Sequence, residues 1–374
     1  MRIEFDRDQL TKGLLRIGTV VERKTTMPVL GNVLLEAAGK SLHIIATDLE
    51  TTIESECPVK VLEEGKVCIP ARNLIDIVKE LPERVGRLKK GENEWMLLES
   101  GKAQFRVVGV PAEKFPRVTE PGQFKFMKIR TETLRDGIEK TSFAISTDEM
   151  RYNLNGAYVE TIKDAKGKNV LRMVTTDGHR LALSDQELGD DENLQLKKGV
   201  ILPRKGVTEL KRLLAETQEP FADIGFGDNS AAVRLEGATV YMRLVVGEFP
   251  DYKAVIPKTN KKKLVIDRAL FTHSLRRVSL FSEGKSKCVR LGLKGDGVHL
   301  AANSPDLGEA EEELRAEFDG GELQIGFNAR YLLDALSVAV GDKVVLELDQ
   351  ETSPGLIKIP DDPGFCGVIM PMRI

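Results

Sequence analysis

The sequence predicts an α+β protein of three similar domains, each with two helices packed on antiparallel sheets. Three observations predict this fold: the length of the chain, a strand–helix unit that occurs three times, and strand-like patterns between the helices. The chain has 374 residues, of which 41% are hydrophobic and 30% are charged. This composition is typical of a globular protein, and the length exceeds the roughly 100–200 residues of one domain. Length alone therefore indicates two or three domains.

Each repeat begins with a short strand, a polar residue and an amphipathic helix. These openings are residues 3–10, 128–134 and 265–270. Asp6, Thr131 and Asp267 are the expected N-caps, because their side-chain oxygens can accept hydrogen bonds from free N–H groups of the first turn. In the first helix, apolar residues recur at steps of three and four from Leu10 to Val21. This spacing predicts a helix with one face in a core.

A second helix is expected later in each repeat, after a strand-like run. These helices open within residues 70–78, 203–210 and 328–336. The repeat interval of roughly 125–135 residues is too long for a solenoid, whose units have about 20–50 residues. Phe-Pro pairs at 115–116 and 249–250 close the first two repeats. We therefore expect domains at 1–125, 126–254 and 255–374.

Alternating or β-branched runs between the helices predict strands. The expected strands are 42–47, 95–99, 104–108, 171–176, 231–235, 240–245, 298–302, 344–348 and 356–359. Glycine-containing turns, such as those at 227–229 and 295–297, separate these strands.

Several classes of protein are disfavoured by composition. No apolar run approaches the ~20 residues of a membrane span, and the N-terminus lacks the apolar core of a secretion signal. We expect a cytoplasmic protein. The scattered histidines have no metal-ligand spacing, so a metal site is not expected. The cysteines should be reduced core thiols. They are Cys57, Cys68, Cys288 and Cys366.

Basic residues are concentrated in three of the expected helices, 7–24, 204–212 and 268–287, although the chain has a net charge of −3. This distribution favours a surface that neutralises phosphates, but ordinary solvated helix faces would have the same composition. No motif for reading bases is present, so any DNA contact should be to the backbone. The candidates from this charge pattern are Lys12, Arg16, Lys205, Arg276 and Arg277.

Three motifs carry a family resemblance. They are RYNLNG at 151–156 followed by TTDGHRLA at 175–182, FPDYKAVIP at 249–257, and VIMPMRI at 368–374. With LGN at 30–32 and TDLE at 47–50, they resemble the bacterial sliding clamps, the beta subunits of the replicative DNA polymerase III holoenzyme. The resemblance extends over the whole chain and depends on several motifs in order.

The resemblance implies a processivity factor: a homodimeric ring of six domains, with helices lining the hole, that encircles and slides on duplex DNA. It also implies a pocket between the second and third domains for short linear motifs of polymerases, the clamp loader and repair proteins. By position, the pocket residues are Leu154, Thr176, Gly178, His179, Arg180, Leu181, Pro250, Val255, Asn328, Tyr331, Val368, Ile369, Met370, Pro371, Met372 and Arg373. Ala254 departs from the pattern, because some members carry arginine there.

The chemistry of these residues suits exchangeable binding. Leucine, valine, isoleucine and methionine side chains at 154, 181, 255 and 368–370 are expected to form an apolar floor. Methionine adapts to varied ligands, and each inserted apolar side chain contributes ~1.5–3 kcal/mol before ordering costs. Micromolar affinity is therefore expected. The same residues would also suit an ordinary core between domains.

Further sites follow from the family positions. DNA contact is expected at Lys24, Arg72, Glu149, Arg151 and Tyr152. The dimer seam is expected to join Phe105 and Val107, on an edge strand, to Leu280 and Phe281, because edge strands pair readily with a second chain.

Two alternatives differ in class. A hydrolase would use His179 and Asp177, but the sequence contains no nucleophile motif, and we expect no catalytic activity. A cytoplasmic interaction scaffold with the same domains would have no role on DNA.

Overall fold

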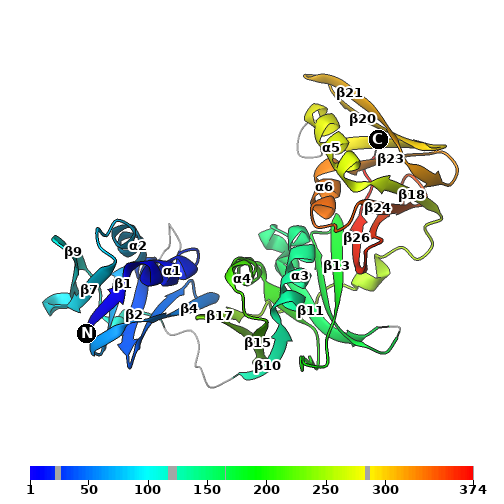
Figure 1. Ribbon diagram of the computed structural model, residues 1–374. Coiled ribbons are helices and arrows are strands. Elements are labelled where there is room, and N and C mark those ends of the chain that lie inside the picture. The colour runs from blue at the N-terminus through cyan, green and yellow to red at the C-terminus, as the bar shows by residue number, and fades with distance from the viewer. Residues whose placement is uncertain (22–26, 117–123, 165, 283–286, 374) are drawn as a thin grey trace. The chain divides into compact units, whose positions relative to one another are not determined.

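The computed structural model describes residues 1–21, 27–116, 124–164, 166–282 and 287–373 (Figure 1). These residues form two compact units. Unit 1 comprises Met1–Glu132, Asp191–Leu194 and Thr208–Leu244, and unit 2 comprises Thr133–Asp190, Gln195–Val207 and Val245–Ile374. None of the described helices is long and apolar enough to span a membrane.

Helices begin at all six predicted places. They are α1 (Arg7–Ile17), α2 (Ala71–Lys79), α3 (Thr131–Thr141), α4 (Arg204–Glu216), α5 (Arg268–Val278) and α6 (Ala329–Ser337). α1 and α5 end well before the expected residues 24 and 287. After α5, the Ser279 hydroxyl donates to the Arg276 carbonyl at 3.0 Å and the Ser282 hydroxyl donates to the Ser279 carbonyl at 2.7 Å. These local bonds satisfy carbonyls that a further helical turn would otherwise use.

Two of the three predicted N-caps are confirmed. Asp6 accepts hydrogen bonds from the backbone N–H groups of Asp8 and Gln9 at 3.0 and 3.1 Å. Asp267 accepts from Leu270 N–H at 2.7 Å. The prediction for Thr131 is wrong, because this residue lies inside the first turn of α3 and its buried hydroxyl has no hydrogen-bond partner.

This difference gives a matched stability test. Asp267→Ala should reduce the free energy of unfolding by about 1 kcal/mol, because a helix N–H loses its partner. Thr131→Val keeps the shape and removes an unsatisfied hydroxyl, so it should leave stability unchanged or raise it. Guanidinium denaturation of both variants measures the difference. A similar loss of stability in both variants would contradict this account of the caps.

The described strands of unit 1 form two antiparallel sheets. The 5-stranded sheet has the order β5 (Lys60–Glu63), β1 (Arg2–Asp6), β7 (Val85–Lys90), β8 (Trp95–Ser100), β9 (Ala103–Val108). The 8-stranded sheet has the order β10 (Lys125–Arg130), β15 (Phe221–Phe226), β16 (Ser230–Leu235), β17 (Ala238–Arg243), β4 (Thr51–Pro58), β3 (Ser41–Thr47), β2 (Asn32–Ala38), β6 (Gly65–Pro70).

Unit 2 also contains two antiparallel sheets in its described part. The 9-stranded sheet has the order β14 (Val200–Pro203), β11 (Gly156–Lys163), β12 (Asn169–Thr176), β13 (Arg180–Glu187), β26 (Asp362–Ile369), β25 (Gly355–Ile359), β24 (Lys343–Leu348), β18 (Lys262–Asp267), β22 (Glu317–Asp319). The 4-stranded sheet has the order β21 (Gly308–Arg315), β20 (Gly297–Ser304), β19 (Cys288–Lys294), β23 (Leu323–Asn328). The predicted strands are confirmed, except that the run at 240–245 ends at Arg243.

The longest sheets are shared between neighbouring repeats. β17 of the second repeat pairs with β4 of the first, and β26 of the third pairs with β13 of the second. We call these two pairings the joints. Backbone hydrogen bonds therefore continue across repeat boundaries, which the sequence did not indicate.

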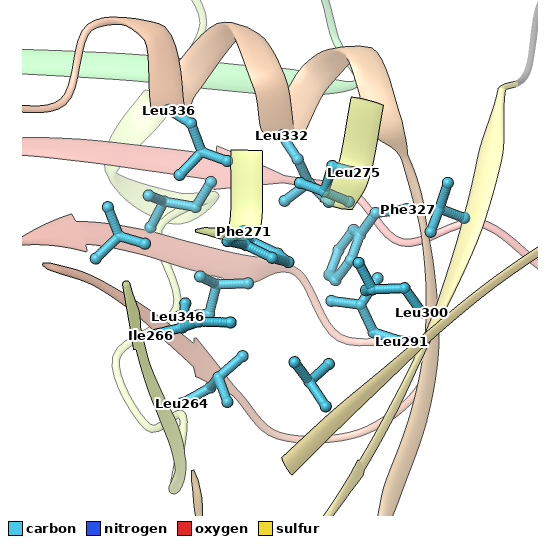
Figure 2. Packing of buried hydrophobic residues seen from close by; sticks show 14 of the residues in the cluster. Leu264, Ile266, Phe271, Leu275, Leu291, Leu300, Phe327, Leu332, Leu336 and Leu346 are labelled. Atoms are coloured by element: carbon cyan, nitrogen blue, oxygen red, sulfur yellow. The ribbon is translucent and has the colours of Figure 1, made fainter. Parts of the chain in front are cut away.

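The core of the third repeat shows how two helices cover the sheets. Phe271 of α5 and Phe327 of β23 are at most 1% exposed, and side chains from α5, α6 and both sheets of unit 2 converge on them (Figure 2). Burial of each such side chain contributes ~1.5–3 kcal/mol. This packing fixes α6, whose first turn carries Tyr331 of the predicted pocket.

The four cysteines are free thiols. Cys57 and Cys68 are buried, and desolvation raises their pKa values to about 11 and about 12. Burial likewise raises the pKa of Cys366 to about 11. These groups remain protonated at neutral pH. The prediction of core thiols is confirmed for Cys57 and Cys68, whereas Cys288 and Cys366 are half-buried.

Candidate functional site

The C-terminal motif and the TDGHR turn lie side by side in unit 2. In the β13–β26 pairing, Leu181 is opposite Val368 and Arg180 is opposite Ile369. The ladder is extended by the Met370 N–H, which donates to the His179 carbonyl at 2.9 Å. Two segments far apart in sequence thus lie side by side within the 9-stranded sheet.

The turn before β13 is held by its own side chains. Asp177 accepts hydrogen bonds from the backbone N–H groups of His179 and Arg180 at 2.9 and 3.0 Å. The Thr176 hydroxyl donates to the Arg180 carbonyl at 2.6 Å. Gly178 has a φ of +87°, which favours glycine. This geometry leaves the His179 side chain exposed at the tip.

Arg180 connects the turn to α6. Its guanidinium donates to Asp177 at 2.9 Å, to Asp334 of α6 at 2.6 Å and to the Phe143 carbonyl at 2.7 Å. The guanidinium carbon also lies 4.4 Å from the ring centroid of Tyr331. The Arg180 side chain is only 10% exposed, and its polar atoms are already bonded within the protein. Arg180 therefore fixes the positions of the groups that it bonds.

The apolar residues of the predicted floor divide into two sets. Val255 is 44% and Met370 38% exposed, whereas Leu154, Leu181 and Val368 are buried. The two exposed side chains can contact a ligand, whereas the three buried side chains belong to the interior of the protein.

Ile369 does not belong to this floor, contrary to the prediction. Successive side chains of a strand point to opposite faces, and Ile369 packs in the core of the third repeat with Phe271 and Phe327. Val368, one residue earlier, packs with Leu181 and Tyr252 on the other face.

The remaining predicted residues surround these groups. Asn328 is 8% exposed and caps α6 by accepting from the Arg330 N–H at 2.9 Å. The Met372 N–H donates to the Gly326 carbonyl at 2.8 Å. We define the candidate partner site by its members, namely Leu154, Thr176, Gly178, His179, Arg180, Leu181, Pro250, Val255, Asn328, Tyr331, Val368, Met370, Pro371, Met372 and Arg373.

Sequence reasoning missed the polar groups that hold this site together. One such group is Asp334, which bonds to Arg180. The others are Glu160, Arg172 and Tyr252, and these three form one hydrogen-bonded cluster. Tyr252 was visible as an aromatic residue within the FPDY motif. Its partners on β11 and β12 carried no local signal, because they are separated from it by about 80–90 residues.

The candidate DNA contacts differ in accessibility. Lys12 of α1, Arg72 of α2 and Arg276 of α5 are exposed, and Lys205 of α4 is half-buried. Glu149, Arg151 and Tyr152 are exposed in the 3₁₀ segment Glu149–Leu154. Lys24 lies outside the described residues.

Two candidates from the charge pattern are engaged within the protein. Arg16 is 8% exposed and donates to the Gly237 carbonyl at 3.0 Å, so its prediction as a phosphate contact is wrong. Arg277 donates to Glu312 at 3.1 Å, and this ion pair offsets its charge. A count of basic residues cannot distinguish such structural arginines from free ones.

The residues of the predicted seam lie on or beside sheet edges. β9, with Phe105 and Val107, is the last strand of the 5-stranded sheet, and β21 is the last strand of the 4-stranded sheet. Leu280 follows α5 and is 71% exposed, while Phe281 packs partly against the third-repeat core.

The 4-stranded sheet carries a hollow outside the candidate partner site. A hollow of about 820 Å³ on the 4-stranded sheet is lined by residues such as Gly292 and His299, and none of its lining residues belongs to the candidate partner site. Among the described residues, no group of three or more His, Cys, Asp or Glu side chains could hold a metal ion.

Comparison with known proteins agrees with these features. Family models of the DNA polymerase III beta subunit match its N-terminal domain at residues 1–119, its central domain at 128–251 and its C-terminal domain at 253–373. The beta sliding clamps of Caulobacter vibrioides and Pseudomonas aeruginosa are 36% and 37% identical to this chain, with 100% of each chain covered.

Solved structures show the same similarity. A sliding clamp from Bartonella birtlesii bound to griselimycin has a TM-score of 0.95 and 37% identity, and one from Pseudomonas aeruginosa bound to griselimycin has a TM-score of 0.92 and 36% identity; 100% of each chain is covered. The fold of three related domains with shared sheets is that of a sliding clamp. The chain belongs to the family of DNA polymerase III beta subunits, the processivity factors of replication.

Proposed function

We propose that two copies of this chain join head to tail in a closed ring around duplex DNA, and that the ring tethers its partners through the candidate partner site. The partners would be the replicative polymerase, the clamp loader, and other polymerases and repair proteins with short linear motifs. In this role the chain acts in the cytoplasm without catalysis, a cofactor or a membrane. Its three domains would meet near residues 125 and 254.

The observation that carries the ring is the arrangement of the sheets. Strands are equivalent here when they hold the same place in the sheet order of their own repeat. One equivalent set is β9, β17 and β26, and a second is β4, β13 and β21. β17–β4 and β26–β13 already pair within the chain. Of these six equivalent strands, β9 and β21 are the two that lie at the end of a sheet without such a partner in the described structure. Pairing β9 of each copy with β21 of the other would make a third equivalent joint and leave none of the six equivalent strands without its partner, which is a closed heterologous assembly.

The chemistry of the two end strands supports this pairing. β21 carries Glu309, Glu311, Glu312 and Glu313, whereas β9 carries Arg106. Opposite charges would therefore meet across the joint, which favours the correct partner edge.

Leu280 and Phe281 occupy the same place in the third repeat as Phe143 does in the second, and Phe143 lies at an existing joint. They follow α5 as Phe143 follows α3, and Phe143 packs against the core of the next repeat. By this equivalence Leu280 and Phe281 would pack against Phe105 and Val107 of the second copy.

The proposed contact with DNA is electrostatic and independent of sequence. Lys12, Arg72 and Arg276 are exposed on helices, with the segment of Arg151 and Tyr152 as a further contact. Backbone contacts of this kind allow sliding, because one phosphate replaces the next without breaking specific base contacts.

Catalysis is disfavoured by the hydrogen bonds that Asp177 makes. Its carboxylate accepts from two backbone N–H groups and from Arg180, so it serves the turn rather than orienting an imidazole. His179 would instead contact partner segments at the exposed tip of that turn.

The test is primer extension on a singly primed circular template, with the replicative polymerase and clamp loader of the same source and ATP. Adding the chain should lengthen the product of a single binding event at least tenfold, because tethering keeps the polymerase at roughly millimolar effective concentration. Unchanged product length in the presence of an active loader would contradict the proposal.

A further inference from the structure

The segment 246–258 carries two residues of the candidate partner site, Pro250 and Val255, yet its regular structure is one short turn, Tyr252–Ala254. Both residues are exposed. An apolar wall helps a ligand only if it stays in place, since ordering a mobile wall on binding reduces affinity. The contacts that hold this segment therefore matter for the site.

Tyr252 anchors the centre of the segment. In sequence Tyr252 lies between the exposed Pro250 and Val255, but Tyr252 itself is buried, with 6% of the residue exposed. The Tyr252 hydroxyl donates to Glu160 Oε1 at 2.5 Å and accepts from Arg172 Nη1 at 3.2 Å. A single phenol thus bonds to two strands of the 9-stranded sheet, β11 and β12.

The partners of Tyr252 are themselves fixed. Arg172 donates to both carboxylate oxygens of Asp185 on β13 at 2.6 Å each. Such two-point pairs hold a guanidinium in one orientation. Glu160 also accepts from the Tyr158 hydroxyl at 3.3 Å. The hydroxyl of Tyr252 therefore meets a donor and an acceptor that are already in position.

The aromatic rings connect this anchor to the site. Tyr252 packs with Leu181 and Val368, which are the buried support of the candidate partner site. Phe249 stacks on Tyr158, with ring centroids 5.0 Å apart. Desolvation raises the pKa of Tyr252 to about 12, so its hydroxyl stays protonated and continues to donate.

We infer that Tyr252, held by Glu160 and Arg172, is a positioning residue that fixes Pro250 and Val255 and thereby sets the affinity of the candidate partner site. This inference rests on the proposed function of that site. Tyr252 itself is buried and acts through the segment that it holds.

The test compares Tyr252→Phe with the wild type in the proposed dimer. The probe is griselimycin, a ligand of two related clamps, which we propose binds this chain at the candidate partner site. Phenylalanine keeps the ring packing and removes both hydrogen bonds. Calorimetric titration should show binding about tenfold weaker, which corresponds to ~1.4 kcal/mol. Hydrogen exchange should become faster in residues 249–256 and stay unchanged in β12 and β13.

Two control variants separate positioning from general destabilisation. Glu160→Gln retains an oxygen that accepts from Tyr252, so it should bind griselimycin within about threefold of the wild type. Tyr241→Phe removes the hydroxyl of a half-buried tyrosine on β17 of unit 1, and should leave binding unchanged.

The outcomes are distinct. Wild-type affinity in Tyr252→Phe would overturn the inference, with or without faster exchange. Weaker binding accompanied by faster exchange throughout the 9-stranded sheet would also overturn it, because the effect would then be general unfolding. If the wild type binds no griselimycin, the proposed site itself fails, and the inference fails with it.

Discussion

Deletion of residues 370–374 is expected to weaken griselimycin binding at least tenfold while the chain stays folded and keeps the proposed dimer, under the proposal that the candidate partner site binds this ligand of two related clamps. The deletion removes Met370, which is 38% exposed in the candidate partner site, and Met372. Each buried methionine contributes ~1.5–3 kcal/mol before ordering costs, so the loss of either one is enough for a tenfold effect. Val368 and Ile369 remain and keep the two adjoining cores intact.

Binding is measured by calorimetric titration and assembly by sedimentation velocity. Met370→Ala isolates the exposed side chain, and Leu62→Ala is its matched control, because Leu62 is 43% exposed on β5 of unit 1. Leu62→Ala should bind like the wild type. A monomeric or aggregated deletion product, or unchanged affinity, would contradict the assignment of the C-terminal motif to the partner site.

Leu280→Lys is expected to weaken the proposed dimer at least 100-fold. Leu280 is 71% exposed in the single chain, so the substitution leaves the fold intact. In the proposed third joint the new ammonium would be buried against Phe105 and Val107 without a partner. An uncompensated buried charge costs several kcal/mol, and 2.7 kcal/mol already corresponds to 100-fold.

Sedimentation equilibrium gives the dissociation constant of the dimer. Val85→Lys is the matched control: Val85 is 57% exposed at the start of β7, and its substitution adds the same charge away from the joint. We expect the control to remain dimeric at concentrations where Leu280→Lys is a monomer. Equal association of both variants would show that Leu280 is outside the interface.

Local signals in the sequence predicted the elements well. Helix starts follow from a polar cap before an amphipathic run, as at Asp6 and Asp267. Thr131 has the same type of signal, but α3 begins one residue earlier than the cap would require, so its hydroxyl has no partner. Strand positions follow from alternation for the same local reason.

Long-range pairing could not be read from local patterns. Nothing in β4 or β17 indicates that they pair, because their residues satisfy alternation equally well with any partner edge. The two joints, and hence the shared sheets, therefore required the structure. The same limit applies to the anchor, since Tyr252 and Arg172 are distant in sequence.

Residue roles within the site were only partly predictable. The family motifs indicated which segments meet, but a motif does not reveal the direction of a side chain. Ile369 lies in the correct segment and points into the core. Arg16 has the charge of a phosphate contact, yet its guanidinium is bonded to Gly237. In both cases the direction of the side chain, and not its type, decides its role.

The retention of loaded protein on circular DNA tests the ring most directly. The chain is loaded with clamp loader and ATP onto a nicked plasmid and passed through a gel-filtration column at high salt, which weakens phosphate contacts but not a topological link. Most of the loaded protein should stay with the circle and be released when a restriction enzyme linearises it. Equal retention on circular and linear DNA, or none on either, would contradict a closed ring.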